Sequence, residues 1–158
     1  MPFDGKDFDL GVIPRDVDIL REARAHIALP DGWSQRHFRD GDARCAMGAM
    51  FDGMAKRRMV GCPDALDLFA ARMLVPVLET PERWMYRGQT LVGWSVSIFN
   101  DSRQTSKSDV LALFDRGIER AETSIAYRRA HFPTRLERWA DRLRALCFAV
   151  TTSTARSK

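Results

Sequence analysis

The residue with the clearest chemical potential is Cys45, which starts the apolar run Cys-Ala-Met-Gly-Ala-Met. If this run opens a helix, free N–H groups and the helix dipole would lower the thiol pKa. A cysteine-dependent hydrolase or transferase also needs a base and an orienting group, and the candidates are His37 and the pair Asn100 and Asp101. Because free cysteines are commonly small buried hydrophobic residues, the favoured interpretation is a structural Cys45 and no catalytic residue.

Metal and nucleotide chemistry has no support in the sequence. The three cysteines and three histidines share no C-x-x-C or H-x-x-x-H spacing, so no metal site is predicted. The sequence also lacks a Walker A motif, a dinucleotide fingerprint and a G-x-S-x-G elbow. No cofactor is therefore expected.

Arginines in the last third of the chain could form a nucleic-acid-binding face. The candidates are Arg128, Arg129, Arg135, Arg138 and Arg142. The last three are three and four residues apart, so on a helix they would share one stripe able to neutralise phosphates. Interspersed acids such as Glu122 and Glu137 can pair with arginines at helical spacing. A solvated helical face is therefore favoured over a phosphate track.

Composition and charge predict one globular domain. The chain has 158 residues, 45% apolar and 29% charged, which suits an independent core. Residues 1–102 carry 13 Lys or Arg against 15 Asp or Glu, and residues 103–158 carry 12 against 6, giving the net charge of +4. No apolar run approaches the roughly 20 residues that span a bilayer. The acidic, broken start and the scattered cysteines favour a cytoplasmic protein without membrane contact.

Helical periodicity and stop signals predict the first elements. Pro14 can open a helix whose apolar stripe reaches Ile27, before Pro-Asp-Gly at 30–32 stops it. The polar loop that follows carries Trp33 and Phe38, whose rings are expected to fold back and close the core.

Two further helices are predicted after this loop. The first runs from Cys45 to about Lys56, and its Gly48 indicates close contact with another helix or a bound group, because glycine costs a helix up to about 1 kcal/mol relative to alanine. The second begins at Pro63 and is kinked or ended by Pro76. Its expected inward residues are Leu66, Phe69, Ala70, Met73 and Leu74.

The segment at 79–99 allows two interpretations. A short helical turn is predicted near Pro81. The run at 91–99 has β-branched residues and partial alternation that suit a short strand, and it fits a buried helix equally well. The segment at 100–106, Asn-Asp-Ser-Arg-Gln-Thr-Ser, predicts a turn that positions the capped helix after it.

Two capping boxes on either side of Pro133 predict a helical hairpin. Ser106 is followed by Asp109, and Thr134 by Glu137, each at the spacing at which a hydroxyl and an acid satisfy two free N–H groups. The predicted helices cover 107–131 and 135–149.

The predicted fold class is mainly α, a single-domain bundle of about five or six helices that could also include one short strand or β-ribbon. Residues 1–150 would form the domain, with an irregular arm at 1–13. Residues 151–158 would form a flexible basic tail.

Several short motifs resemble a pattern in small bacterial and bacteriophage proteins of unknown function. There, a G-W loop precedes C-A-x-G-A, and a later W-N-D segment leads into a T-x-x-[DE]-V helix. The matching residues here are Gly32-Trp33, Cys45-Ala-Met-Gly-Ala49, Asn100-Asp101, Thr105 and Asp109-Val110-Leu111. The similarity covers about residues 17–121, with Phe99 in place of the Trp and one extra residue before Asp-Val. It implies a small helical domain in a bacterial or phage setting and supplies no reaction.

Three functions are therefore expected, in this order. The first is a non-enzymatic interaction module that binds a protein partner in that setting, of which inhibition of a host defence complex is one form. The second is a nucleic-acid-associated protein that uses the basic C-terminal face. The third is a cysteine-dependent enzyme centred on Cys45.

Overall fold

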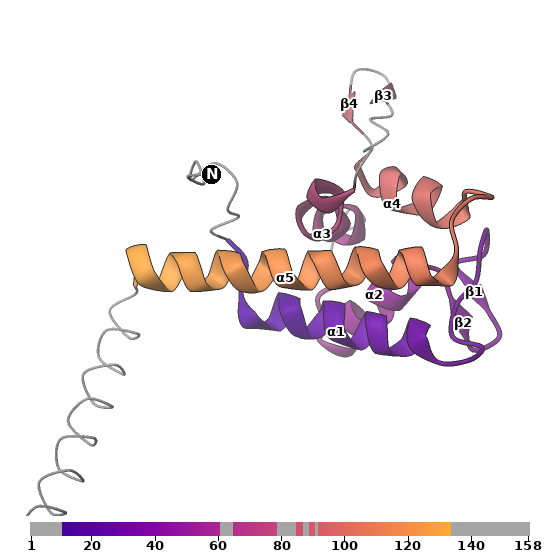
Figure 1. Ribbon diagram of the computed structural model, residues 1–158, viewed down its shortest axis with the longest axis horizontal. Helices are drawn as coiled ribbons and strands as arrows, with labels where there is room; N and C mark the ends of the chain where they lie inside the picture. Colours follow the sequence, from indigo (N-terminus) through magenta and orange to yellow (C-terminus); the bar gives the residue numbers. More distant parts are fainter. Residues whose placement is uncertain (1–10, 61–64, 79–84, 87–88, 91, 134–158) are drawn as a thin grey trace, which may run out of the picture.

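The computed structural model is mainly helical and is built along one long helix (Figure 1). It describes residues 11–60, 65–78, 85–86, 89–90 and 92–133. The helices are α1 (Pro14–Ala28), α2 (Ala46–Lys56), α3 (Ala65–Met73), η2 (Val75–Val77, a 3₁₀ turn), α4 (Val92–Asp101) and α5 (Lys107–His131). The predicted mainly α class is confirmed.

Helices α1 and α5 lie antiparallel side by side, and α5 extends beyond α1 at its C-terminal end (Figure 1). Helix α2 packs against α1, and α3 packs against α4. Two short antiparallel ribbons complete the described part. Strand β1 (Arg39–Asp40) pairs with β2 (Ala43–Arg44), and β3 (Met85–Tyr86) pairs with β4 (Gln89–Thr90). The first ribbon lies at the end of the bundle where α5 begins.

The helix ends follow from local chemistry. Pro14 is the first residue of α1, and the Asp16 carboxylate accepts the N–H of Ile13 at 2.9 Å. At the start of α5, Ser106 accepts the N–H of Asp109 while the Asp109 carboxylate accepts the N–H of Ser106, so the predicted capping box is confirmed. These bonds satisfy donors that the first helical turn leaves unpaired.

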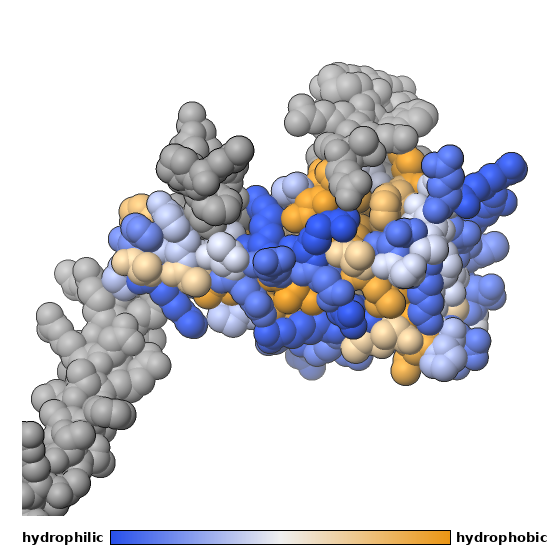
Figure 2. Space-filling model, in the orientation of Figure 1, coloured by the Kyte–Doolittle hydropathy of each residue, from blue (hydrophilic) through white to orange (hydrophobic). Residues whose placement is uncertain are grey.

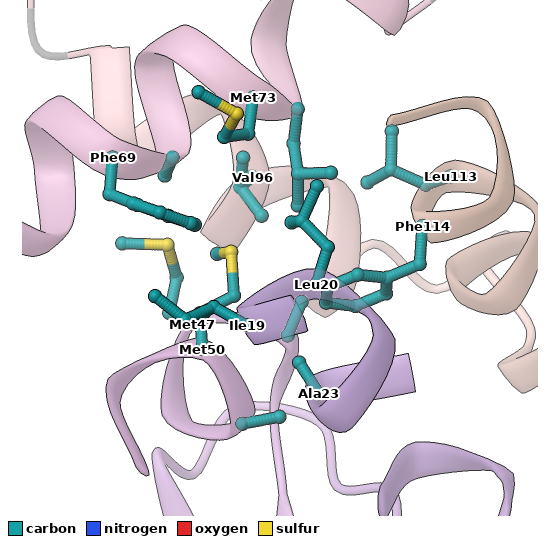
Figure 3. Close-up of a cluster of buried hydrophobic side chains, with 14 of the residues drawn as sticks. Ile19, Leu20, Ala23, Met47, Met50, Phe69, Met73, Val96, Leu113 and Phe114 are labelled. Atoms are coloured by element: carbon teal, nitrogen blue, oxygen red, sulfur yellow. The ribbon is translucent and has the colours of Figure 1, made fainter. Parts of the chain in front are cut away.

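In the described part of the chain, one apolar core joins α1, α2, α3, α4 and α5 (Figure 3). It contains Ile19 and Leu20 of α1, Met47 and Met50 of α2, Phe69 and Met73 of α3, Val96 of α4, and Leu113 and Phe114 of α5. Gly53 lets α1 and α2 approach closely, because a methyl group there would lie 3.2 Å from Cγ2 of Ile19. The inward residues predicted for α3 are confirmed as buried or packed against this core.

The strand interpretation of residues 91–99 is wrong, and the helix interpretation is confirmed for the described residues 92–99. The turn predicted at 100–106 is present but begins at Ser102, because Asn100 and Asp101 still belong to the helix. Residues 92–101 form α4, with both polar residues in its last turn. Val96 and Asn100 are fully buried and four residues apart, so they share the inward face of a helix. The partial alternation of so short a run did not distinguish a helix from a strand, because contacts with other helices determine its conformation.

Several predictions lie outside the described residues: the helix at 135–149, the tail at 151–158, and the turn near Pro81. The expected number of five or six helices is not confirmed. Four helices in the described ranges have ten residues or more, and α3 is a shorter helix of nine. None of the described helices is both long and apolar enough to cross a lipid bilayer.

Candidate functional site

The side chain of Asn100 connects three segments that are distant in sequence. Its Oδ1 accepts the indole N–H of Trp33 at 2.9 Å and the backbone N–H of Ala46 at 3.1 Å. Its Nδ2 donates to the carbonyl of Ser34 at 3.1 Å and to Oδ1 of Asp101 at 2.8 Å. Both acceptor positions and both donors of the amide are thus occupied. Asn100 is completely buried, so every bond matters to the fold.

Gln35 and Asp101 complete this arrangement. The Gln35 amide lies 3.0–3.1 Å from the carbonyls of Asn100, Ser102 and Thr105, at the end of α4 where helical carbonyls lack internal partners. Asp101 Oδ1 also accepts the backbone N–H of Arg36 at 2.8 Å. No sequence signal singled out Gln35, because a glutamine in a polar loop has no distinctive pattern. We call this hydrogen-bonded group (Trp33, Ser34, Gln35, Ala46, Asn100 and Asp101) the Asn100 junction.

The junction fixes residues 33–38, called here the Trp33 loop. Arg36 has φ +63°, a left-handed conformation that costs a non-glycine residue about 1 kcal/mol or more. The carbonyl of Phe38 lies directly against Gly48 of α2, where any Cβ would overlap it. The close neighbour predicted at Gly48 is therefore the loop backbone, whereas the prediction named another helix or a bound group.

The two aromatic residues of the loop behave differently. Trp33 is partly buried against the core, as predicted. Phe38 is 42% exposed, so the prediction that its ring closes the core is wrong. Its ring instead makes an edge contact with Phe51, with centroids 5.6 Å apart.

Cys45 is the N-cap of α2 and is 8% exposed. Burial raises the pKa of its thiol, and this outweighs the N–H groups of Gly48 and Met47 that favour the thiolate. Of the N–H groups at this helix start, Gly48 does donate to the Cys45 Sγ at 3.3 Å, whereas Ala46 donates to Asn100 instead. The pKa-lowering effect of a helix start is therefore overcome by desolvation at this site.

Iodoacetamide labelling should reflect this burial. In a Cys62→Ser/Cys147→Ser variant, where Cys45 is the only thiol, native protein should react at least about tenfold more slowly than urea-unfolded protein. The expected rate is unchanged by His37→Ala. Rapid native modification below pH 7 that disappears in the His37→Ala variant would contradict a structural Cys45.

The candidate catalytic residues come together only in part. Asn100 and Asp101 lie at the start of α2 beside Cys45, where Asp101 acts on the thiol through its charge. His37 is exposed, and its imidazole makes no hydrogen bond to Cys45, Asn100 or Asp101 among the described residues. The Asn100 amide, which could orient a catalytic base, already makes all its hydrogen bonds within the fold. Among the described residues, no base is bonded to the Cys45 thiol.

The arginine candidates divide between described and undescribed residues. Arg128 donates through Nη1 to the carbonyl of Val12 at 2.9 Å, so it connects α5 to the backbone just before α1. Arg129 is exposed beside a cleft between α1 and α5. Arg135, Arg138 and Arg142 lie outside the described residues.

Two acids of α5 pair with arginines of α1. Glu122 binds Arg21, and Asp115 binds Arg24 through both carboxylate oxygens. The bond of Glu122 therefore joins two helices, whereas the sequence predicts a pairing within one helix. Hydrogen bonding to Asp115 raises the pKa of Arg24, so this cation stays charged. These pairs reduce the free charge on this side of α5.

Open clefts lie between the helices in the described part of the chain. One of about 390 Å³ is between the end of α4 and the start of α5, and Asp109 is the only ionisable residue in its described lining. Hydrogen bonds to Ser106 hold the pKa of Asp109 below its usual value, because that carboxylate already caps α5. Clefts of about 270 Å³ and 260 Å³ separate α1 from α5 and α1 from α2. Within the described ranges, no group of three potential metal ligands occurs.

Residues 13–120 match the profile of a family described as a family of unknown function (DUF6197). This chain belongs to that family. The match to DUF6197 includes the whole Asn100 junction, and its extent is close to the 17–121 expected from the motifs. No curated protein and no solved structure matches the chain. Membership of DUF6197 supplies no reaction, so the geometry has to carry any functional conclusion.

Proposed function

We propose that this chain is a non-enzymatic interaction module that binds a protein partner in a bacterial or bacteriophage setting, within a reducing cytoplasm. The observation that supports the proposal is the hydrogen bonding of the Asn100 amide. Its two donors and two acceptor positions are all used inside the fold. Polar residues that could have served a reaction instead fix the Trp33 loop. Inhibition of a host defence complex is one concrete form of this function.

The proposal is tested by affinity purification of tagged protein from its native host, with quantitative mass spectrometry. A partner should be recovered in near-stoichiometric amount after nuclease treatment, and equally with the Cys45→Ala variant. Retention by Cys45→Ala separates binding from thiol chemistry, because a covalent step needs the sulfur. Loss of the partner with nuclease would favour the basic C-terminal face, and recovery of a Cys45-linked adduct would favour an enzyme.

A further inference from the structure

We propose that residues 135–149 form a helix that folds back after Pro133 and lies in the cleft between α1 and α5. These residues lie outside the described ranges. The hairpin predicted from the sequence names no face of α5 and gives α1 no part, whereas the cleft defines both. This inference does not rest on the proposed function. Its consequence is that the cleft is closed to outside partners.

The cleft has an apolar floor and a charged rim. Its volume is about 270 Å³, and its floor includes Val17 of α1 and Ile125 of α5, both nearly buried. Exposed charged residues of both helices form the rim: Asp18, Arg21, Glu122 and Arg129. Figure 2 shows hydrophobic patches between hydrophilic side chains over α1 and α5. Such a groove suits the apolar stripe of an amphipathic helix whose charges lie at its edges.

The segment at 135–149 has the matching pattern. At helical spacing its apolar residues share one stripe, which consists of Leu136, Trp139, Ala140, Leu143, Leu146 and Cys147. Glu137 and Arg144 lie on one side of this stripe. Arg138 and Arg142 lie on the other side. A helix of this length is marginally stable alone in water, so its stripe needs a surface to cover it.

The end of α5 directs the chain back along α5. The helix ends at His131, and the capping box predicted at Thr134 and Glu137 starts a new helix directly after Pro133. Helices joined by so short a connection pack antiparallel. A helix over 135–149 has about four turns, so it reaches back past every residue that α5 contributes to the cleft.

Phe132 supports this placement. Its side chain is 58% exposed, the most among the large apolar side chains of the described residues. It follows Ile125 by about two helical turns, so it continues the face of α5 that lines the cleft. A helix that folds back over this face covers the ring and removes apolar surface from water.

The charges on the α5 side of the cleft match this register. In an antiparallel hairpin centred on Pro133, Arg129 lies opposite Glu137. In the same register, Glu122 lies opposite Arg144. Both pairs join opposite charges, and complementary charges of this kind fix register more than they add stability.

The other edge of the new helix meets α1 in the same way. Arg21 of α1 binds Glu122 of α5, and this bond sets the relative level of the two helices. Asp18 precedes Arg21 by about one turn, which brings it close to the level of Arg142 in the folded-back helix. The acid of α1 therefore faces the basic edge of the helix.

Chemical crosslinking of the full chain tests the placement. In a background whose native cysteines are replaced by alanine, bismaleimidoethane should join Asp18→Cys to Arg142→Cys within one molecule. Thr123→Cys with Arg142→Cys is the matched control and should not crosslink, because Thr123 is exposed at a similar level of α5 but lies outside the lining of the cleft. Tryptic mass spectrometry identifies the joined peptides.

The other outcomes would overturn the proposal. Crosslinked dimers would place the segment in the cleft of a second copy. A crosslink of the Thr123 pair in place of the Asp18 pair would put the helix on another face of α5. Absence of a crosslink in both pairs would mean that the segment does not lie along α5.

Hydrogen exchange gives a second measurement that needs no cysteine. Amides of residues 138–147 should exchange about tenfold or more slowly than in an unstructured peptide, because an isolated helix of this length opens readily. Leu143→Asp should abolish this protection while leaving that of α1 unchanged. Ala145→Asp, on the opposite side of the predicted helix, should retain it. Unprotected amides in the unmodified protein, or equal protection in both variants, would contradict docking through the apolar stripe.

Discussion

Replacing Asn100 by alanine is expected to destabilise the folded protein by about 3–5 kcal/mol, the largest effect of any single substitution considered for this chain. The variant leaves the Trp33 indole N–H, the Ala46 N–H and the Ser34 carbonyl without their partner, and two of these three bonds are fully buried. Each buried polar group without a partner costs about 1–3 kcal/mol. Urea unfolding followed by circular dichroism measures the difference.

Two further variants make this prediction specific. Gln104→Ala, on the exposed side of the following turn, should change stability by no more than about 0.5 kcal/mol. Asn100→Asp keeps the acceptor but loses the donor to Ser34, and it buries a carboxylate beside Asp101. Burial and the like charge raise the pKa of that new carboxylate in the folded state. Its penalty should therefore be greatest at neutral pH and shrink as pH falls towards about 4. A full-sized, pH-independent penalty would contradict this account.

Replacing Gly48 by alanine is expected to destabilise the protein by about 1–3 kcal/mol, although helix propensity alone predicts a gain of up to about 1 kcal/mol. The added methyl group would overlap the carbonyl oxygen of Phe38, and that oxygen belongs to backbone fixed by the Asn100 junction. The loop has to move away from α2 to accept it. Chemical denaturation measures the change in the free energy of unfolding, and its sign decides between crowding and helix propensity.

Gly53→Ala is the matched control on the same helix. Its methyl group would lie 3.2 Å from the Cγ2 methyl of Ile19 and 3.6 Å from the Ile19 carbonyl oxygen, which is much milder crowding than the overlap at Gly48. The gain in helix propensity and the cost of crowding Ile19 then nearly cancel. We therefore expect the free energy of unfolding to change by no more than about 1 kcal/mol. A stabilised Gly48→Ala variant would mean that the loop does not lie against α2.

Local signals in the sequence determined the start of α1, the start of α2 and both ends of α5. Pro14, the capping box of Ser106 and Asp109, and the proline after Phe132 act within one helical turn, so they need no knowledge of the rest of the fold. The apolar stripe of α1 likewise identified its buried face, because helical period is a property of the chain alone. The expectation of a family of unknown function is confirmed by the profile match over residues 13–120.

The tertiary structure alone decided the conformation of residues 92–101 and the use of the chemically suggestive side chains. By sequence, Asn100 is typical of a turn, whereas in the fold its side chain is bonded to Trp33, Ser34 and Ala46. By sequence, Cys45 is typical of an activated thiol at a helix start, whereas in the fold burial raises the pKa of this thiol. These outcomes depend on contacts between residues more than 50 positions apart, and desolvation at such contacts outweighs local preference. A sequence pattern records which groups can bond, whereas the packed fold determines which partners they find.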